Sequence, residues 1–238
     1  MNEKAFPKEL SLLEARLGHI FSDSSILRTA LTHSSYSNEL RAHGIFIKYN
    51  ERMEFLGDAV LQIVTSEYLF SKYPDMPEGD LSPVRASAVC EEALYRYAKD
   101  VSLGDFLLLG KGEEHDGRNK KSILADAFEA VLAALFLDGG IAAVKPFLLP
   151  FLTEEIGRIV ETGSYKDYKT ELQQFIQADR GEHPDYFVVS ESGPAHKKLF
   201  EVEAMLNSNV IGRGKGASKR EAEQQAAKEA LRLFGLIQ

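Results

Sequence analysis

Residues 50–61, with the sequence NERMEFLGDAVL, carry the pattern that decides how most of this chain folds. Glu51, Glu54 and Asp58 stand at i, i+3 and i+7, and a period of 3.6 residues gathers them within about 60° of one helix face. Three like charges this close weaken an isolated helix, so we expect a cation to compensate them. Taken alone, the segment also fits a solvated acidic face on which Arg52 is the local partner.

A second acidic pair, Asp126 and Glu129, lies in residues 124–135, LADAFEAVLAAL, and all the remaining residues of this segment are apolar. Asp126 and Glu129 are three residues apart, on a helix most of whose faces must be buried. Buried carboxylates are rarely left unpaired, because an uncompensated charge is costly to bury, and few Lys or Arg are near in sequence. Two helices with inward-facing carboxylates form an all-oxygen cage suited to Mg²⁺ or Mn²⁺, and no His or Cys stands at the spacing expected of a zinc site.

The rest of residues 9–160 also has apolar residues at three- and four-residue spacing, with Gly or Pro between the segments. We therefore expect an all-α domain over residues 1–160. Cys90 is the only cysteine, which excludes an intramolecular disulfide and any cysteine-based zinc cluster. We expect Cys90 to be a small core residue.

Two helix boundaries can be predicted from local signals. Ser82-Pro83 is typical of an N-cap followed by proline in the first turn, which predicts a helix start there, after a turn at residues 77–80. Gly139-Gly140 predicts the end of the helix that spans residues 121–137.

The pattern changes after residue 160, which indicates a domain boundary. We expect a linker at residues 161–165 and a small α+β domain over residues 166–236. Within it, residues 200–206 alternate between apolar and polar, as a half-buried strand does. Residues 218–221, SKRE, form a capping box that opens a last helix. The predicted order is α-β-β-β-α.

The net charge of −8 is unevenly spread along the chain. Residues 1–163 hold 17 Lys and Arg against 25 Asp and Glu, whereas residues 164–238 hold 11 of each. Residues 211–220 contain four cations and no acid. Polyanion binding needs a local basic surface, and total charge decides little about it. The charged N-terminus and the lack of a long uncharged apolar run predict a cytoplasmic protein without a membrane partner.

The two acidic segments together resemble a known family. Residues 50–61 are similar to the signature of ribonuclease III, and residues 122–139, SILADAFEAVLAALFLDG, resemble that family's second acidic motif. The likeness extends to residues 30–36, ALTHSSY, and to residues 78–82, EGDLS. It covers nearly the whole chain.

The resemblance implies an endoribonuclease that cuts double-stranded RNA with Mg²⁺, for which Mn²⁺ can substitute. Products with a 5′-phosphate and a 3′-hydroxyl are implied, as are staggered ends, a homodimer and a role in processing RNA such as ribosomal precursors. A small-molecule substrate is not expected. The implied metal-binding acids are Glu54, Asp58, Asp126 and Glu129, among which Asp58 and Glu129 are the catalytic positions.

Three further positions in the nuclease domain have an implied role and an alternative. Glu51 and Glu78 match peripheral acids that help to organise RNA and metal, although Glu78 is equally well explained as a turn residue ahead of a helix. Phe55 lies between the acids and cannot share their face. The resemblance implies that Phe55 packs into the partner subunit of a homodimer, and an ordinary core phenylalanine is the alternative.

The C-terminal segment is similar to a double-stranded RNA-binding domain over about 70 residues, a fold that reads two minor grooves and the phosphates between them. The implied minor-groove contacts are Thr170, Gln173, Gln174 and His196. The implied phosphate contacts are Lys215, Lys219 and Arg220. Lys219 and Arg220 stand in the first turn of the last helix, where cations are unfavourable because of the helix dipole. An anionic partner is therefore expected for both side chains. For the two glutamines a solvated helix face is the alternative.

Two other functions compete with this interpretation. One is an RNA-binding protein whose nuclease-like domain serves only for assembly, but loss of the acids would mark such a protein and all four are present. The other is a helical metal-dependent phosphohydrolase acting on nucleotides, a class that has no need of an RNA-binding tail.

Overall fold

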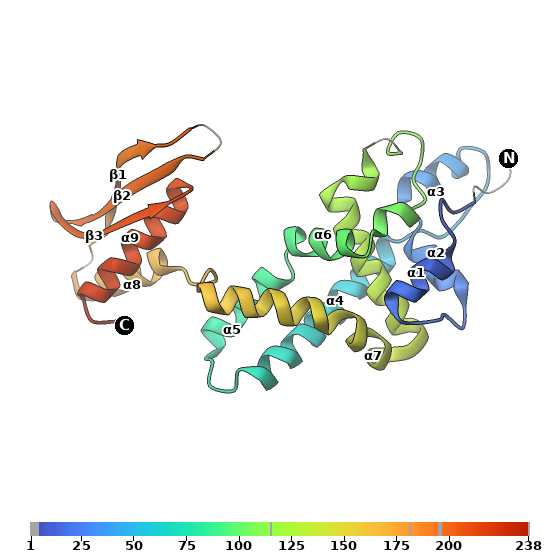
Figure 1. Ribbon diagram of the computed structural model, residues 1–238, viewed down its shortest axis with the longest axis horizontal. Helices are drawn as coiled ribbons and strands as arrows, with labels where there is room; N and C mark the ends of the chain where they lie inside the picture. Colours follow the sequence, from blue (N-terminus) through green and yellow to red (C-terminus); the bar gives the residue numbers. More distant parts are fainter. Residues whose placement is uncertain (1–4, 115, 181, 195–196, 238) are drawn as a thin grey trace. The chain divides into compact units, whose positions relative to one another are not determined.

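The computed structural model describes residues 5–114, 116–180, 182–194 and 197–237. The chain divides into two compact units, Met1–Tyr165 and Lys166–Gln238 (Figure 1). The first is helical and the second combines helices with a three-stranded sheet, which confirms the predicted fold class. Each unit has its own hydrophobic core.

The N-terminal unit is built around two long helices that lie side by side, α4 and α7 (Figure 1). Its helices in chain order are α1 (Leu10–Leu17), α2 (Ser24–Ala30), α3 (Ser34–Arg41), α4 (Glu51–Lys72), α5 (Glu78–Ala88), α6 (Glu91–Asp100) and α7 (Lys121–Thr162), with short 3₁₀ helices at Leu103–Phe106 and Gly117–Asn119. In α7 the ring of Phe128 packs against those of Tyr97, Phe147 and Phe151. This aromatic cluster is part of the hydrophobic core.

Helix α7 is interrupted at Gly140, as the glycine pair predicts. The backbone of Gly140 has φ 66° and ψ −166°, a conformation that is not helical and that only glycine adopts readily. The helix is long and apolar enough to cross a membrane by length and composition. However, residues 123–135 except Asp126 and Glu129 are buried in the core of the unit. Helix α7 is therefore a core helix of this unit.

Two local predictions for this unit were wrong. Helix α5 begins at Glu78 after an N-cap at Pro77, so that Pro83 lies inside it instead of opening it. A proline this early removes only one intrahelical hydrogen bond, which packing against α7 and α4 outweighs. Cys90 is exposed rather than buried, because as the N-cap of α6 it stands at the end of a connection on the surface.

The C-terminal unit has the predicted α-β-β-β-α order. It consists of α8 (Tyr168–Arg180), β1 (Asp185–Ser192), β2 (Leu199–Leu206), β3 (Asn209–Gly216) and α9 (Lys219–Leu233). The sheet is antiparallel in the order β1-β2-β3, and α9 packs on β2 and β3. Val202 and Ala204 are buried, as the alternation predicts. The hydroxyl of Ser218 accepts a hydrogen bond from the Glu221 N–H, which confirms the cap of α9.

Candidate functional site

Three of the predicted acids meet between α4 and α7. Glu54 from α4 and Asp126 and Glu129 from α7 each offer a carboxylate oxygen, and these oxygens all lie within 4.8 Å of one another. All three residues are half-buried. We call this group the carboxylate cluster.

A glycine allows the two helices to approach closely enough to form the carboxylate cluster. A Cβ atom built on Gly57 would lie 1.8 Å from the backbone oxygen of Glu129 and 2.4 Å from its carbonyl carbon. No side chain fits there without moving one helix. Gly57 lies one turn after Glu54, so this close approach lies next to the cluster.

Burial and mutual repulsion shift the pKa values of the clustered acids upward. Burial, followed by the charges of Asp58, Glu54 and Asp126, raises the pKa of Glu129 from its ordinary 4.5 to about 8. Burial and the charges of Asp126 and Glu51 raise the pKa of Glu54. Burial also raises the pKa of Asp126. Each shift means that the protein without a bound cation disfavours the ionised acids.

Among the described residues, no Lys or Arg side chain supplies the cation that we expect to offset the charge of the clustered acids. Among the residues that the structure describes, no Lys or Arg forms an ion pair with Glu54, Asp126 or Glu129, and Arg52 is exposed. A half-buried group of three carboxylates without a Lys or Arg partner among the described residues is a natural site for a divalent ion. The interpretation as a solvated acidic face therefore does not fit.

Of the other predicted acids, Asp58 and Glu51 lie near the cluster. Asp58 is exposed one turn further along α4, and its carboxylate accepts a hydrogen bond from Gln62 Nε2 at 3.2 Å. Its charge contributes to the raised pKa of Glu129, so it lies close to the cluster. Glu51 is exposed, and its charge contributes to the raised pKa of Glu54. Glu78 is not one of the clustered acids, and its carboxylate accepts a hydrogen bond from Ser82 Oγ at 2.8 Å.

Two residues near the cluster were not found as site residues from the sequence. After burial, the charge of Glu91 at the start of α6 is the largest contribution to the raised pKa of Asp126. His33 is half-buried, and burial lowers its pKa although the charges of Glu113 and Asp126 oppose the shift. His33 caps α3, since its Nδ1 accepts a hydrogen bond from the Ser35 N–H. Neither Glu91 nor His33 stands at a helical spacing from the predicted acids in the sequence, so no local pattern links them to the site.

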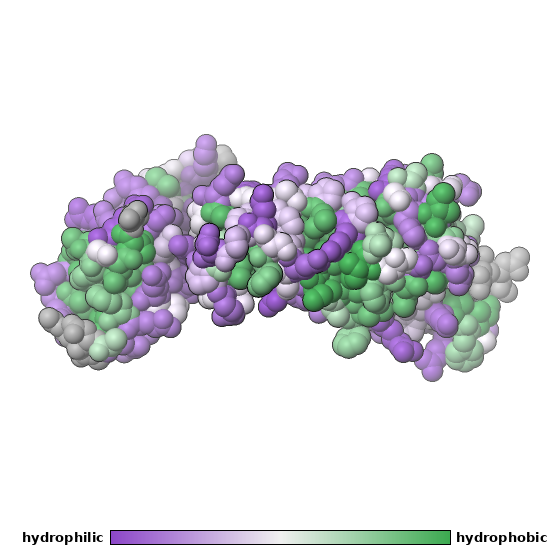
Figure 2. Space-filling view, turned by 90° about the horizontal axis from the view of Figure 1, so that it is seen from below, coloured by the Kyte–Doolittle hydropathy of each residue, from purple (hydrophilic) through white to green (hydrophobic). Residues whose placement is uncertain are grey.

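Phe55 lies on a different side of α4 from the cluster and is 82% exposed, so it is not a core phenylalanine. Other large apolar side chains exposed in the same helix pair are Ile63 and Phe70 of α4 and Leu137 of α7. Figure 2 shows apolar surface over the part of the N-terminal unit where Figure 1 places α4 and α7. We call these four residues the apolar patch.

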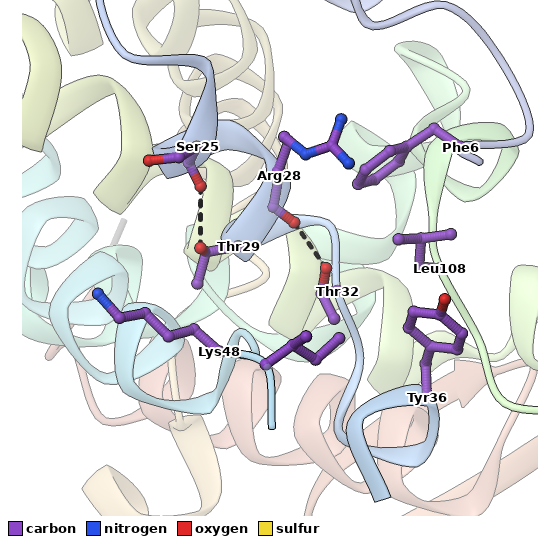
Figure 3. Close-up of a pocket in the computed structure, with 9 residues that line it drawn as sticks. Phe6, Ser25, Arg28, Thr29, Thr32, Tyr36, Lys48 and Leu108 are labelled. Carbon is purple, nitrogen blue, oxygen red and sulfur yellow. Dashed lines mark hydrogen bonds between the residues drawn. The ribbon is translucent and has the colours of Figure 1, made fainter. Parts of the chain in front are cut away.

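A separate hollow of about 350 Å³ lies among α2, α3 and the segment before α4 (Figure 3). The Arg28 guanidinium stacks on Phe6, with its central carbon 4.8 Å from the ring centroid. The hydroxyls of Thr29 and Thr32 donate to the backbone oxygens of Ser25 and Arg28. Because no acid of the cluster lines it, this hollow is not the reaction site.

The predicted RNA contacts in the C-terminal unit are exposed, except that His196 lies outside the described residues. Thr170, Gln173 and Gln174 lie on α8. Lys215 Nζ is 3.4 Å from Glu201, and Lys219 Nζ is 3.5 Å from Glu191. Exposed pairs of this kind contribute little and do not prevent contact with phosphate.

Comparisons with known proteins agree with this arrangement. Residues 23–156 match the family model described as ribonuclease-III-like, and residues 168–233 match the double-stranded RNA binding motif. The chain is 47% identical over 224 residues to ribonuclease 3 of Pelotomaculum thermopropionicum. This aligned region covers 94% of this chain and 92% of that protein. It is 50% identical over 215 residues to ribonuclease 3 of Streptococcus sanguinis, with 89% and 90% covered. The chain belongs to the ribonuclease III family.

A solved structure supports the same conclusion for the nuclease domain. The nuclease domain of ribonuclease III from Campylobacter jejuni matches with a TM-score of 0.56 and 40% identity, over 62% of this chain and 98% of that one. The chain is thus an endoribonuclease specific for double-stranded RNA, with its RNA-binding motif in the C-terminal unit.

Proposed function

We propose that this ribonuclease III cleaves double-stranded RNA with Mg²⁺ held by Glu54, Asp126, Glu129 and Asp58, leaving 5′-phosphate and 3′-hydroxyl ends. The observation that carries the proposal is the carboxylate cluster, in which three acids converge without a Lys or Arg partner among the described residues. The raised pKa of Glu129, about 8, supports it, because a bound cation would relieve the repulsion that causes part of the shift.

The donor set fits a hard divalent ion. All ligand atoms are carboxylate oxygens, which Mg²⁺ and Mn²⁺ prefer, and no sulfur or imidazole belongs to the cluster. An ion of this kind, when bound, activates water as a nucleophile and stabilises the charge that develops on the attacking and leaving oxygens.

The protein's own residues hold and orient the reacting groups. Glu129 must lose its proton to bind the ion, and its place against Gly57 fixes its backbone relative to α4. Asp58, held by Gln62, extends the acidic surface toward solvent, where the scissile phosphate must approach. We assign Glu51 and Glu78 supporting roles at the edge of the site.

A homodimer completes the proposal. The apolar patch, which includes Phe55, forms a surface that a monomer would leave in water. A hollow of about 670 Å³ beside them, lined by Met53, Leu56 and Leu137 among others, offers a complementary surface for an aromatic side chain of a second copy. In the Campylobacter jejuni nuclease domain, a region involved in dimer formation shows structural flexibility. A symmetric pair of sites would cut opposite strands and leave staggered ends.

In the C-terminal unit we assign Thr170, Gln173, Gln174 and His196 to minor grooves and Lys215, Lys219 and Arg220 to phosphates. Cytoplasmic processing of structured transcripts, such as ribosomal RNA precursors, follows as the expected role. Neither a membrane nor a small-molecule substrate has a place in this proposal.

The decisive experiment is incubation of the full chain with a long RNA duplex and Mg²⁺, with single-stranded RNA and duplex DNA as controls. Of the three substrates, only duplex RNA should be cut, and end-labelling should show 5′-phosphates on the products. Mn²⁺ should support cleavage, whereas Ca²⁺ should support binding with little cleavage, because its longer and looser coordination does not hold a compact geometry. Equal rates in Ca²⁺ and Mg²⁺ would contradict the proposed role of the carboxylate cluster.

A further inference from the structure

A glutamine of α9 is hydrogen-bonded to the start of α8 by both ends of its side-chain amide. Gln224 Nε2 donates to the Asp167 carboxylate at 2.8 Å, and Gln224 Oε1 accepts from the Lys169 N–H at 3.2 Å. Gln224 itself is half-buried. We call these two hydrogen bonds the Gln224 bridge.

Asp167 connects the Gln224 bridge to an assigned RNA contact on α8. Its carboxylate also accepts hydrogen bonds from the Thr170 N–H at 3.2 Å and from the Thr170 hydroxyl at 2.9 Å. Because this hydroxyl donates to Asp167, its oxygen keeps lone pairs that can accept from a 2′-hydroxyl in a minor groove. The place of the Thr170 hydroxyl therefore depends on Asp167, and through Asp167 on Gln224.

Asp167 also lies within electrostatic reach of an assigned phosphate contact on α9. The hydrogen bond from Gln224 is the largest cause that lowers the pKa of Asp167, and the positive charge of Arg220 contributes to the same shift. Arg220 stands about one turn before Gln224 on α9. The Gln224 bridge thus joins the parts of the two helices that carry both groups of contacts.

The residue before Gln224 binds the same turn of α8. Glu223 pairs with Lys169 Nζ at 2.6 Å, and this ammonium lies 4.6 Å from the centre of the Tyr186 ring. Lys169 is therefore held by Glu223 through its side chain and by Gln224 through its backbone.

The apolar core alone does not fix this arrangement. Leu172 and Ile176 of α8 share one core with Ala222 and Ala226 of α9, so the helices stay packed without the Gln224 bridge. However, apolar contact is not directional, whereas a hydrogen bond requires a defined distance and angle. The Gln224 bridge is what specifies how the start of α8 lies against α9.

This spacing matters because the domain reads the shape of a duplex. It contacts minor grooves and the phosphates of the major groove between them, and the major groove of A-form RNA is narrow. In B-form DNA the major groove is about 12 Å wide. Contacts held at one spacing on α8 and α9 can fit only one of these two forms.

We propose that the Gln224 bridge sets the α8–α9 spacing that fits A-form RNA, so that Gln224 is a positioning residue for the selection of duplex RNA over duplex DNA. The proposal rests on the RNA contacts assigned above to Thr170, Lys219 and Arg220. Gln224 acts through Asp167 and Thr170 and needs no contact with RNA itself.

The test compares two labelled duplexes of the same sequence, one RNA and one DNA, each of about 16 base pairs, the length that one such domain spans. Fluorescence anisotropy with the full chain, at fixed salt and in EDTA to prevent cleavage, gives both affinities. The wild type should prefer RNA. Gln224→Glu, which faces the Asp167 carboxylate with a second negative charge, should weaken RNA binding about tenfold and DNA binding less than about threefold.

Gln225→Glu is the matched control, because it adds the same charge at the next, exposed position of α9 and should weaken either duplex less than about threefold. Gln224→Glu/Asp167→Asn is the rescue variant. The new amide at position 167 can donate to the new carboxylate at position 224, and the net charge equals that of the wild type. RNA affinity should return to within about threefold of the wild type.

Thermal unfolding shows that each variant is folded. Equal losses in Gln224→Glu and Gln225→Glu would overturn the proposal, because the added charge alone would explain them. A fall of RNA and DNA affinity by the same factor, or a folded rescue variant that does not recover, would also overturn it. A wild type that binds neither duplex, or a Lys219→Ala/Arg220→Ala variant that binds RNA as the wild type does, would instead contradict the assigned RNA contacts on which the proposal rests.

Discussion

At the residue scale, the most informative side chain is Glu129. Its apolar helix buries it, and its acidic neighbours raise its pKa from 4.5 to about 8. Between these two values the folded protein without metal binds more protons at this position than the unfolded chain does. Its stability must therefore fall as pH rises through that window, and above pH 8 the slope from Glu129 disappears.

The variant Glu129→Gln should remove this pH dependence. Without divalent ions, wild-type stability measured by urea unfolding should decrease from pH 5 to pH 8 more than that of the variant, which has no acid to ionise at this position. Mg²⁺ should stabilise the wild type more strongly at pH 8 than at pH 5, because binding releases the proton. Cleavage should be lost, whereas duplex binding should stay within a few-fold of wild type. Parallel pH profiles for the two proteins would refute the assignment.

Gly57 sets the distance between the two acidic helices. The change Gly57→Ala places a methyl group 1.8 Å from the Glu129 backbone oxygen, so α4 and α7 must separate. We expect a loss of about 1–3 kcal/mol of stability, as in other overpacked sites, and a drop in cleavage of at least tenfold at saturating RNA.

The matched control for Gly57 is Gly79→Ala in α5. A Cβ atom there meets nothing within 4 Å, so stability should be unchanged or should rise by up to about 1 kcal/mol. Thermal unfolding and single-turnover cleavage compare the two. If Gly57→Ala behaves like Gly79→Ala, the close contact does not position the carboxylate cluster.

At the element scale, α7 is two helical segments joined at Gly140. The first presents Asp126 and Glu129, and both segments contribute buried residues to the core. The sequence predicts the break, since two adjacent glycines end a helix, but the chain resumes a helix at once because Val144 and Leu148 are buried in the same core.

The change Gly140→Ala should destabilise the N-terminal unit, because φ 66° with ψ −166° is strained for any residue with a Cβ atom. We expect a cost of about 1–3 kcal/mol. Gly157→Ala, also in α7 but with open space around its Cβ position, is the control and should be neutral or slightly stabilising. Calorimetry of the full chain gives both values, and similar melting temperatures for the two variants would argue against strain at Gly140.

At the scale of the whole molecule, the proposed assembly depends on Phe55. Exposure of this ring together with Ile63, Phe70 and Leu137 leaves the described surface of α4 and α7 unusually apolar. If a second copy covers it, the pairing of sites for staggered cleavage follows from symmetry.

The variant Phe55→Glu should convert the dimer into a monomer, because it places a charge in an apolar interface. Sedimentation velocity at micromolar concentration measures this directly, and nicking of one strand should replace paired cuts. Phe187→Glu, on an exposed strand of the other unit, is the control and should remain dimeric. A dimeric Phe55→Glu variant would show that this ring is not the contact.

The two kinds of fold, the acidic helix faces and the family resemblance could all be predicted from the sequence. Periodicity and capping are local properties, so the spacing of Glu54 and Asp58 and that of Asp126 and Glu129 could be read directly from the chain. Which acids meet could not be predicted, because it depends on how two distant helices pack at Gly57, where an added Cβ atom would lie 1.8 Å from the Glu129 backbone oxygen. For the same reason the sequence did not predict that Glu91 and His33 lie near the carboxylate cluster, that α5 starts before Pro83, or that Cys90 is exposed. Packing between segments far apart in sequence leaves no local pattern.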